Sequence, residues 1–423
     1  LYQAQEQLHG FLRNFPNRTV ASALRLCIFP RGRTYFAPAD KLGHDIVRLL
    51  IRPTEVRERL SNHVYKVSDG NNPLSDLQTA LETEYEEEHR MLIDLVQSFV
   101  EKELMPFEKI IMEREARGEE ARLTGDEEAP LIKKSKELGL FALDAPEEAG
   151  GAGLPTIVMM GIHEQLKRTV TPFIFPPDSP NLHMLMAVAS PEQKRKYMEP
   201  YARGEMKSCI AISEPQAGGD PAQMRTRAVR EGDAWVINGR KIWVSNVPSA
   251  DFIILMAVTD PDLGARGGIT AFIVERDTPG FIIEREIPML GGHRTYELII
   301  DNLRLSDDQV LGAVGQGFAP MQKRLTVRRL EMGASAVGIA SRALEMMCAH
   351  VQNRETFGQK LADRQAIQWW VADAATKIHA TRLMVLDAAR KQDRGEDVRT
   401  VASMIKVFAT EMAEETIHHA MQS

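Results

Sequence analysis

The sequence predicts an α+β fold: a helical N-terminal domain, then an antiparallel β domain, then a helical bundle. Two changes of hydrophobic period carry this prediction. Residues 83–207 have apolar side chains at helical spacing, whereas residues 208–315 contain short apolar runs separated by Gly, Asp and Pro. Helical spacing returns over residues 316–423 and continues to the last residue. We therefore expect the C-terminal bundle to be incomplete.

The first helical domain opens with LETEYEEEHRMLIDLVQSFVEKELMPFEK, which is acidic at its start. Apolar side chains such as Leu92, Leu95, Val96 and Phe99 then form one stripe, as expected of an amphipathic helix. EEAPLIKKSKELGLFAL and IVMMGIHEQLKR are the next helical stretches. The second of these has bulky side chains that we expect to form the floor of a pocket.

The β domain is predicted from AWVING, DFIILMAV, GITAFIVE and LIIDNLRL. Runs of this length, with turn residues between them and no intervening helix, indicate an antiparallel sheet or a small barrel. No GxGxxG follows a strand and no Walker loop is present, so the usual phosphate-binding loops of nicotinamide and ATP enzymes are not expected.

Composition excludes several classes of protein. The chain has 423 residues and a formal charge of -7, which gives no reason to expect a nucleic-acid partner. Three scattered cysteines, Cys27, Cys209 and Cys348, suit small apolar roles better than a disulfide framework or a metal cluster, so no metal is expected. No run of about 18 apolar residues is present, which argues against a spanning helix.

Residues 1–82 differ from the rest of the chain. They form a predicted basic helical extension that ends in the turn-rich linker VSDGNNPLSDL. Residues 1–50 could pack on the rest of the protein or lie on a membrane surface, and both readings stay open. The chain begins on Leu1 in helical period and ends with ETIHHAMQS in mid-helix. We therefore expect a piece of a longer protein.

Four strings together resemble the acyl-CoA dehydrogenases over residues 84–423: CIAISEPQAGGD, WVINGRKIWVSNVPSADFIILMAV, RETFGQKLADRQAIQ and ASMIKVFATEMAEETIHHAMQ. Residues 1–82 are similar to the C-terminal extension of the large bacterial fatty-acid acyl-CoA dehydrogenases. That order fits either a tandem fusion of two dehydrogenases or an artefact of joining two reading frames.

The resemblance implies a function. Enzymes of this family remove a proton from the carbon α to a fatty acyl-CoA thioester and a hydride from the β carbon. The products are a trans-2-enoyl-CoA and reduced FAD, and the electrons pass to an electron-transferring flavoprotein in fatty-acid β-oxidation. The implied protein is a bacterial cytoplasmic homodimer or homotetramer. Such chemistry needs a carboxylate base and hydrogen bonds to the developing enolate oxygen.

The resemblance also implies a flavin face on the β domain. Ser213 matches a hydroxyl near the pyrimidine edge, Trp243 an indole against the ring system, and Ser245 a hydroxyl near the reactive nitrogen. A tryptophan with a hydroxyl two residues later on a strand puts both on one side of the sheet. Gly219 departs from the family, where a serine precedes the aspartate, although its backbone amide can still donate to a flavin phosphate.

A second set of matching residues lies in the C-terminal domain. By resemblance, Arg354 reaches the pyrophosphate of a FAD held by a neighbouring subunit, with Phe357 beside its adenine end and Gln365 close by. Arginine suits phosphate by its charge and fork geometry. Gln422 matches a glutamine next to a Gly-Gly turn that holds the dinucleotide, and this turn would follow the last residue.

The catalytic base is not assigned. Arg329 matches a helix arginine that faces the acyl-CoA. Arg328 stands where a minority of the family carries its catalytic glutamate, and a cation cannot take the α proton. Glu331, one turn later, is a secondary candidate. The base is therefore expected in a Tyr-Glu-Gly stretch beyond Ser423.

Two other functions stay open on the sequence. An acyl-CoA oxidase or nitroalkane-type flavoenzyme of the same fold would differ in oxygen access, and a non-catalytic scaffold member would lack the base. The length and branching of the acyl chain are not encoded in any pattern that we could interpret.

Overall fold

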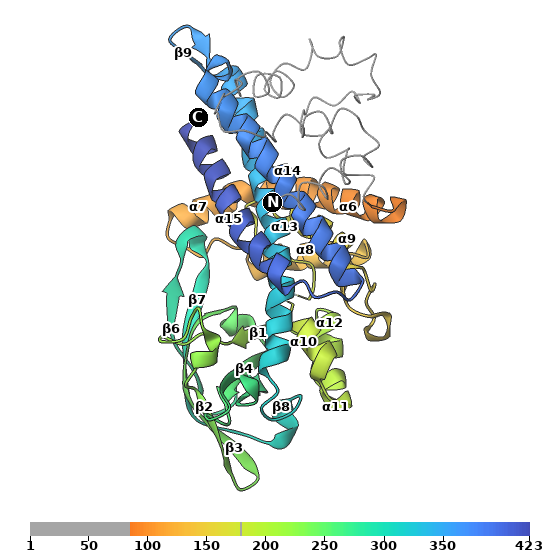
Figure 1. The fold of residues 1–423 in the computed structure, drawn as a ribbon, viewed down its shortest axis with the longest axis vertical. Coiled ribbons are helices and arrows are strands. Elements are labelled where there is room, and N and C mark those ends of the chain that lie inside the picture. The colour runs from red at the N-terminus through yellow and green to blue at the C-terminus, as the bar shows by residue number, and fades with distance from the viewer. Residues whose placement is uncertain (1–84, 178–179) are drawn as a thin grey trace, which may run out of the picture. The chain divides into compact units, whose positions relative to one another are not determined.

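The computed structural model describes residues 85–177 and 180–423, and over these ranges the chain combines helices with one large sheet. Helical, β and helical segments follow one another in the predicted order, which confirms the predicted fold class (Figure 1). The expected basic helix and linker of residues 1–82 lie outside the described residues. In the described part of the chain, no helix is both long and apolar enough to cross a bilayer.

The N-terminal helices pack around a cluster of three phenylalanines. Phe99, at the end of α6 (Glu87–Phe99), contacts Phe173 and Phe175 with ring centroids 5.6 and 5.4 Å away. The amphipathic stripe predicted for α6 therefore faces the core. The other helices of this segment are α7 (Glu108–Ala116), α8 (Gly125–Glu137), α9 (Thr156–Leu166), α10 (Asn181–Val188), α11 (Pro191–Gln193) and α12 (Glu199–Ala202).

Helix α8 is shorter than its sequence pattern suggested. It begins at a capping box in which Thr124 and Glu127 bond each other's backbone amides, and it ends at Glu137. Gly139 has a φ of +75° and turns the chain, so GLFAL runs on as irregular backbone. The apolar residues of that stretch, Leu140 among them, are nevertheless buried.

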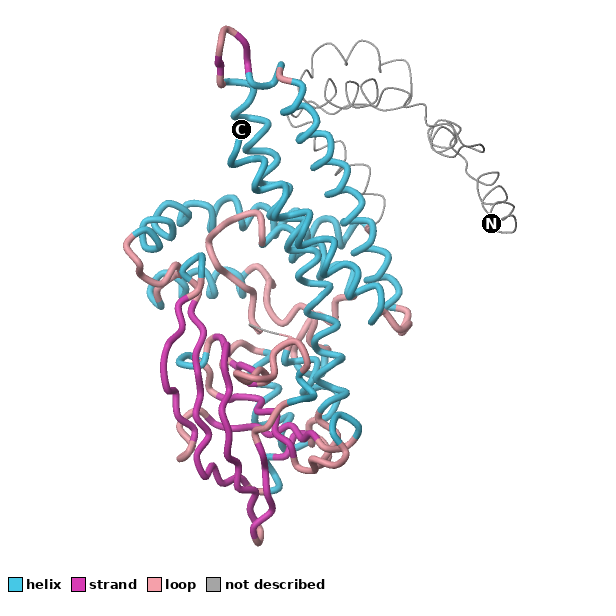
Figure 2. Tube along the Cα trace, turned by 60° about the vertical axis from the view of Figure 1, so that its left-hand side comes forward, coloured by secondary structure: helices cyan, strands magenta, loops and turns pink. Residues whose placement is uncertain are grey.

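The β domain is one eight-stranded sheet with the order β6-β7-β3-β2-β4-β5-β8, and β1 pairs with β4. Figure 2 shows its strands gathered in one layer, with the long helices extending away from them. The strands are β1 (Ser208–Ala211), β2 (Arg227–Glu231), β3 (Ala234–Ser245), β4 (Phe252–Val258), β5 (Ile269–Glu275), β6 (Phe281–Pro288), β7 (Arg294–Leu305) and β8 (Val310–Leu311).

Most strand pairs are antiparallel as expected, but β1 and β4 run parallel, with Ser208 opposite Phe252. The long connection between them contains a loop and the β2–β3 hairpin, and β2 also pairs with β4 in parallel, at Arg227 and Val258. Parallel neighbours need such a crossover, whereas the lack of helices between the strands had predicted antiparallel pairing.

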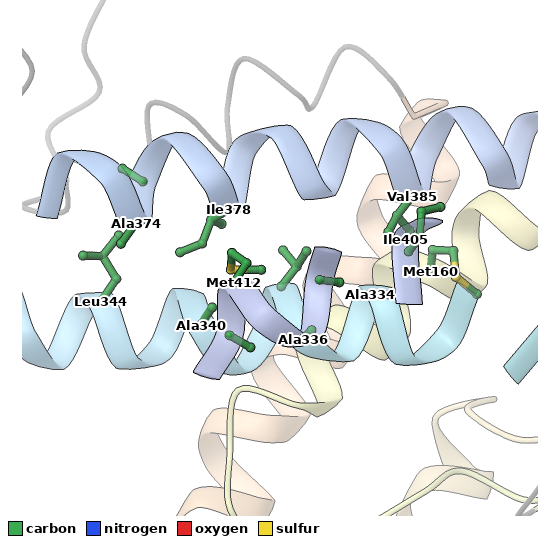
Figure 3. Packing of buried hydrophobic residues seen from close by; sticks show 14 of the residues in the cluster. Met160, Ala334, Ala336, Ala340, Leu344, Ala374, Ile378, Val385, Ile405 and Met412 are labelled. Carbon is green, nitrogen blue, oxygen red and sulfur yellow. The ribbon is translucent and has the colours of Figure 1, made fainter. Parts of the chain in front are cut away.

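The C-terminal domain consists of three long helices: α13 (Phe318–Asn353), α14 (Gln365–Asp393) and α15 (Arg399–Gln422). Small side chains let them approach closely. Ala334, Ala336 and Ala340 of α13 face residues of α14 and α15 in one apolar core, to which α9 adds Met160 (Figure 3). Each free cysteine of the described residues, Cys209 and Cys348, is buried, which agrees with a packing role.

Helix α9 links the two helical domains. A Cβ added to Gly338 of α13 would lie 2.0 Å from the carbonyl oxygen of Glu164, so only glycine permits this approach. The Glu164 carboxylate accepts hydrogen bonds from Arg382 of α14 at 2.8 to 3.2 Å. Both side chains of this ion pair are almost fully buried. The position of α9 against α13 is therefore fixed by both packing and charge.

Candidate active site

Strand β3 presents an exposed tryptophan. Trp243 is 51% exposed, although its neighbours Ile242 and Val244 are buried. Its φ is +61°, at a point where the β3–β7 register shifts between Lys241 and Val244. A bulge of this kind turns a side chain out of the sheet, and the left-handed backbone of a bulky residue is a strained conformation.

Ser245 follows two residues later on the same strand. Its Oγ lies 3.1 Å from Nε2 of His293, which precedes β7. Val244, between the two, is buried, whereas Trp243 is exposed and Ser245 is half-buried. The strand thus offers an apolar platform with a hydroxyl beside it.

The loop after β1 is tied to β3 through a buried ion pair. The Lys241 ammonium donates to Glu214 Oε1 at 2.7 Å and to the carbonyl oxygen of Ile212 at 3.1 Å. The Lys241 and Glu214 side chains are 0% and 2% exposed. Burial lowers the pKa of Lys241 to about 8, against the opposing effect of Glu214, so the ammonium stays charged at neutral pH.

Glu214 has further partners. It accepts hydrogen bonds from the backbone amides of Arg225 and Thr226 at 2.6 and 3.0 Å, and from the Gln216 amide at 2.6 Å. Burial raises the pKa of Glu214, but the charge and hydrogen bond of Lys241 lower it more, and the net shift is downward. The carboxylate therefore fixes both ends of the loop.

This loop carries two of the residues identified by resemblance. The carbonyl oxygen of Ser213 accepts from the Ile242 amide at 2.9 Å, so Ser213 lies directly beside the strand position of Trp243. Gly219 is exposed, and a Cβ added there would have no atom within 4 Å. Open space beside a backbone amide suits an anionic group such as a phosphate.

Four other predicted residues gather at the opposite end of the long bundle. Arg354 follows α13, and Phe357 occupies the tip of the hairpin β9 (Glu355–Thr356) and β10 (Gln359–Lys360). Gln365 begins α14 and Gln422 ends α15. These helix ends meet, as the stacked rings of Trp370 and His419, 4.6 Å apart, show. Figure 1 places β9 and the C-terminus at the same end of the bundle.

One protomer therefore holds two separate sets of site residues. Helix α13 begins next to the sheet, where the Gly317 amide donates to Ile269 of β5 at 2.8 Å, and it ends before Arg354. Its 36 residues span about 54 Å at 1.5 Å per residue. Arg354 thus lies at the end of α13 that is far from its contact with β5.

A shallow hollow lies between α9, α13 and residues 174–177 and 180. Two of its polar residues, Arg328 and Glu331, were singled out by the resemblance in the sequence, whereas His163 and Asp144 were not. Arg328 and Glu331 line it from α13, His163 lines it from α9, and Asp144 comes from the preceding loop. Arg329, the predicted substrate residue, is half-buried but is not among the described residues that line it. Adjacent helix residues point about 100° apart, which explains the difference.

The charges in the hollow are grouped in pairs. Arg328 Nη1 donates to Glu331 Oε2 at 2.8 Å, and His163 Nε2 lies 3.8 Å from Glu331 Oε1. Burial lowers the pKa of His163, so its ring is neutral at neutral pH. Asp144 Oδ2 lies 3.1 Å from Nε2 of His183. Burial opposes this pair, yet the mutual hydrogen bond and charge lower the pKa of Asp144 and raise that of His183.

These residues fit FAD. The exposed indole of Trp243 offers a flat apolar surface to a ring system, and Ser245 offers a hydroxyl at its side. The Gly219 amide and the Arg354 guanidinium are each of a kind that suits a phosphate. In the described part of the chain, no group of three or more His, Cys, Asp or Glu could hold a metal ion.

Family models match most of the chain. Those of the acyl-CoA dehydrogenase N-terminal, middle and C-terminal domains match residues 86–205, 209–303 and 315–423. A model described as acyl-CoA dehydrogenase, C-terminal, bacterial type, matches residues 1–139. These matches confirm both resemblances seen in the sequence.

Individual proteins of the same family are also similar to this chain. The (R)-benzylsuccinyl-CoA dehydrogenase of Thauera aromatica is 39% identical over 79% of this chain and 85% of its own. The 3-(aryl)acrylate reductase of Clostridium sporogenes is 33% identical over 80% and 88%. A chain in the structural work on the electron transferring flavoprotein of Acidaminococcus fermentans is 32% identical, with a TM-score of 0.70, over 80% and 87%. The chain therefore belongs to the acyl-CoA dehydrogenase family, whose members are FAD-binding oxidoreductases that act on CH–CH bonds.

Proposed function

We propose that the protein catalyses the FAD-dependent α,β-dehydrogenation of a fatty acyl-CoA thioester to a trans-2-enoyl-CoA, and that the electrons pass to an electron-transferring flavoprotein. The observation that carries the proposal is the exposed Trp243 on a bulged strand beside the loop fixed by Glu214. Bound FAD supplies the hydride acceptor. The similarity to a chain from work on an electron transferring flavoprotein supports the choice of electron acceptor.

The residues of the β domain orient the cofactor. Trp243 stacks against the flavin ring, and the Ser245 hydroxyl donates a hydrogen bond to it. The Ser213 hydroxyl contacts the pyrimidine edge, and the Gly219 amide donates to a phosphate. Because Lys241 and Glu214 hold the loop against β3, these groups keep their spacing when the cofactor arrives.

The other four residues complete the site of a neighbouring subunit. Phe357 is 99% exposed, and an aromatic ring held out in water at a hairpin tip suits a surface that another molecule covers. Arg354, Gln365 and Gln422 lie at the same end of the bundle. We assign all four to a FAD held mainly by a second copy of this chain, in a homodimer or homotetramer.

Glu331 is assigned to a supporting role. One of its oxygens accepts the Arg328 hydrogen bond, and the other faces the neutral His163. A carboxylate engaged in this way holds Arg328 in place and does not serve as the α-proton base. A Glu331→Gln variant should therefore keep the rate of any thioester-dependent flavin reduction within about threefold, since one hydrogen bond to Arg328 remains.

The proposed function is tested by anaerobic titration of the FAD-loaded chain with acyl-CoA thioesters. Loss of the flavin absorbance, formation of an enoyl-CoA, and recovery of colour on adding an electron-transferring flavoprotein would support it. Fast recovery of colour in air without that partner would favour the acyl-CoA oxidase or nitroalkane-type activity. Tight thioester binding without any bleaching would favour a non-catalytic scaffold.

A further inference from the structure

The hollow between α9 and α13 has an apolar floor. Met159, Ile162 and Leu166 line it from α9, and Ile174 and Phe175 line it from the following segment. This is the helix whose bulky side chains predicted a pocket floor. A surface of this kind suits the carbon chain of an acyl group and does not suit the diphosphate of coenzyme A.

The Arg328 guanidinium lies beside this floor, and most of its N–H donors are not used. Arg328 makes one hydrogen bond within the described residues, to Glu331, and a guanidinium has five N–H donors. Its side chain is 43% exposed, whereas the Glu331 side chain is 7% exposed. The buried Glu331 thus holds one side of the Arg328 guanidinium, and the rest of the guanidinium is exposed at the hollow.

A second cation lies close by. Lys167 follows His163 by four residues, so both occupy one face at the end of α9. Lys167 directly follows Leu166, which lines the hollow. Burial lowers the pKa of its ammonium, the charge of Arg328 lowers it further, and the charge of Glu331 raises it. Within the described residues, Lys167 has no hydrogen-bond or ion-pair partner. Two neighbouring cations that repel each other favour an anion between them.

The acidic groups around the hollow are already engaged. Glu331 is paired with Arg328, and Asp144 with His183. Neither is left to repel an incoming carboxylate without compensation, and His183 carries added positive charge because its pKa is raised by Asp144 in spite of burial. A hydrocarbon chain alone would leave the donors of Arg328 and Lys167 covered and without partners, which is unfavourable.

We infer that the hollow binds an acyl chain that itself carries a free carboxylate, held by Arg328 with the help of Lys167. The substrate class is then the CoA monothioesters of dicarboxylic acids. This inference rests on the proposed function, since it concerns the acyl part of the same thioester. A carboxylate receives two parallel N–H donors from one guanidinium, which makes Arg328 the larger contributor.

The test is isothermal titration of the full chain, saturated with FAD, with pairs of thioesters of equal chain length. The pairs are succinyl-CoA and butyryl-CoA, glutaryl-CoA and valeryl-CoA, and adipyl-CoA and hexanoyl-CoA. We expect the dicarboxylic member to bind about tenfold more tightly in at least one pair. Free coenzyme A is titrated as a third ligand.

Variants locate the contact. Arg328→Met should remove the preference, lowering affinity for the dicarboxylic thioester about tenfold while leaving its uncharged counterpart and free coenzyme A within about twofold. Lys167→Met should lower the same affinity by about threefold, and it leaves the Arg328–Glu331 contact intact if Arg328→Met fails to fold. Arg342→Met is the matched control, because it lies 14 positions further along α13, about 21 Å away.

Each other outcome decides against the inference. Equal or tighter binding of the uncharged thioester in every pair would overturn the carboxylate subsite and leave the proposed function standing. An equal loss of coenzyme A affinity in Arg328→Met would assign this residue to the phosphates instead. If the FAD-loaded chain bound none of the thioesters, the proposed function would fail together with the inference.

Discussion

Two groups of buried or half-buried charges in this protein differ in how fully they are paired. In the sheet, Lys241 and Glu214 share a 2.7 Å contact, and Glu214 accepts three further hydrogen bonds. At the hollow, Arg328 makes one hydrogen bond, and Lys167, which follows the lining residue Leu166, makes none within the described residues. The same kinds of side chain therefore serve two purposes, one structural and one open to a ligand.

The difference follows from the cost of burying charge. An ionised group removed from water is tolerated when its hydrogen-bonding capacity is used within the protein. The pair in the sheet meets that condition and holds the loop of Ser213 in place. The cations of the hollow do not meet it, and a ligand anion would supply what is missing. Substitutions of the pair in the sheet should therefore lower stability, whereas substitutions of the cations at the hollow should lower ligand affinity and change stability little.

Lys241→Met should cause the largest loss of stability. The substitution leaves the Glu214 carboxylate 2% exposed and without its counter-charge, and breaking a buried ion pair in this way costs about 3–5 kcal/mol. The free energy of unfolding in urea should fall by that amount. FAD affinity should fall as well, because the loop that carries Ser213 and Gly219 loses its attachment to β3.

The control for this variant is Lys133→Met on α8, where the side chain is 80% exposed. It should change the free energy of unfolding by no more than about 0.5 kcal/mol. If Lys241→Met lost as little stability as the control, the buried pair would not stabilise the sheet. The contrast between this pair and the cations at the hollow would then not hold.

Trp243→Ala should separate cofactor binding from stability. The indole is half-exposed, so the free energy of unfolding without FAD should change by less than about 1 kcal/mol. Loss of the stacking surface should weaken FAD binding about tenfold, which corresponds to about 1.4 kcal/mol. Fluorescence titration of the apoprotein measures the affinity.

Trp243→Phe is the matched variant, since it keeps an aromatic face at the same position, and it should restore most of the affinity. FAD binding that is unchanged in the alanine variant would remove Trp243 from the site. A cooperative loss of folding would instead make it a core residue.

Much of the fold could be predicted from local patterns in the sequence. The changes of period near residues 208 and 316 coincide with the start of β1 and the region just before α13. The period of two in a strand predicted one side for Trp243 and Ser245, but it could not predict the bulge and the φ of +61° at Trp243. These periods depend on neighbouring residues and need no knowledge of the tertiary structure.

The hollow could be found only in part: the bulky side chains of α9 predicted its floor and the resemblance singled out Arg328 and Glu331, but His163 and Asp144 were not identified. Arg328 and Glu331 are visible as a pair one turn apart, and His163 and Lys167 as another. Their meeting depends on the close approach of α9 to α13, which Gly338 permits. A glycine inside a helix has several possible roles, so the contact of Gly338 with α9 cannot be predicted from the sequence. The parallel pairing of β1 with β4 was missed for the same reason.

The Asp144–His183 pair offers a pH-dependent comparison. His183 has a pKa above its usual 6.5, because the hydrogen bond and charge of Asp144 outweigh burial. Its contribution to stability is complete below pH 6.5 and is lost as the pH rises through the folded-state value. Asp144 has a pKa below its usual 3.8, so its contribution is present above that pH and lost on further acidification.

His183→Gln should therefore be most destabilising near pH 5, by about 1 kcal/mol, and should approach wild type at alkaline pH. Urea unfolding of both proteins across the pH range measures this difference. A difference that does not change with pH would mean that the pair acts through packing or a neutral hydrogen bond. The charge of Asp144 would then not be compensated by His183.

Lys167→Met should have the smallest effect on stability, although the chemical change is the same as in Lys241→Met. Since Lys167 has no hydrogen-bond or ion-pair partner among the described residues, no acid loses its counter-charge. The change in the free energy of unfolding should stay within about 0.5 kcal/mol and should favour the variant at neutral pH, where wild type carries a half-buried charge. Burial lowers the pKa of Lys167 in the folded state, so the unfolded chain binds more protons at alkaline pH. Wild type should therefore gain stability relative to the variant as the pH rises towards 10.5.

A loss of stability in Lys167→Met as large as that in Lys241→Met would instead mean that Lys167 is paired inside the protein. It would then have no charge to offer a ligand.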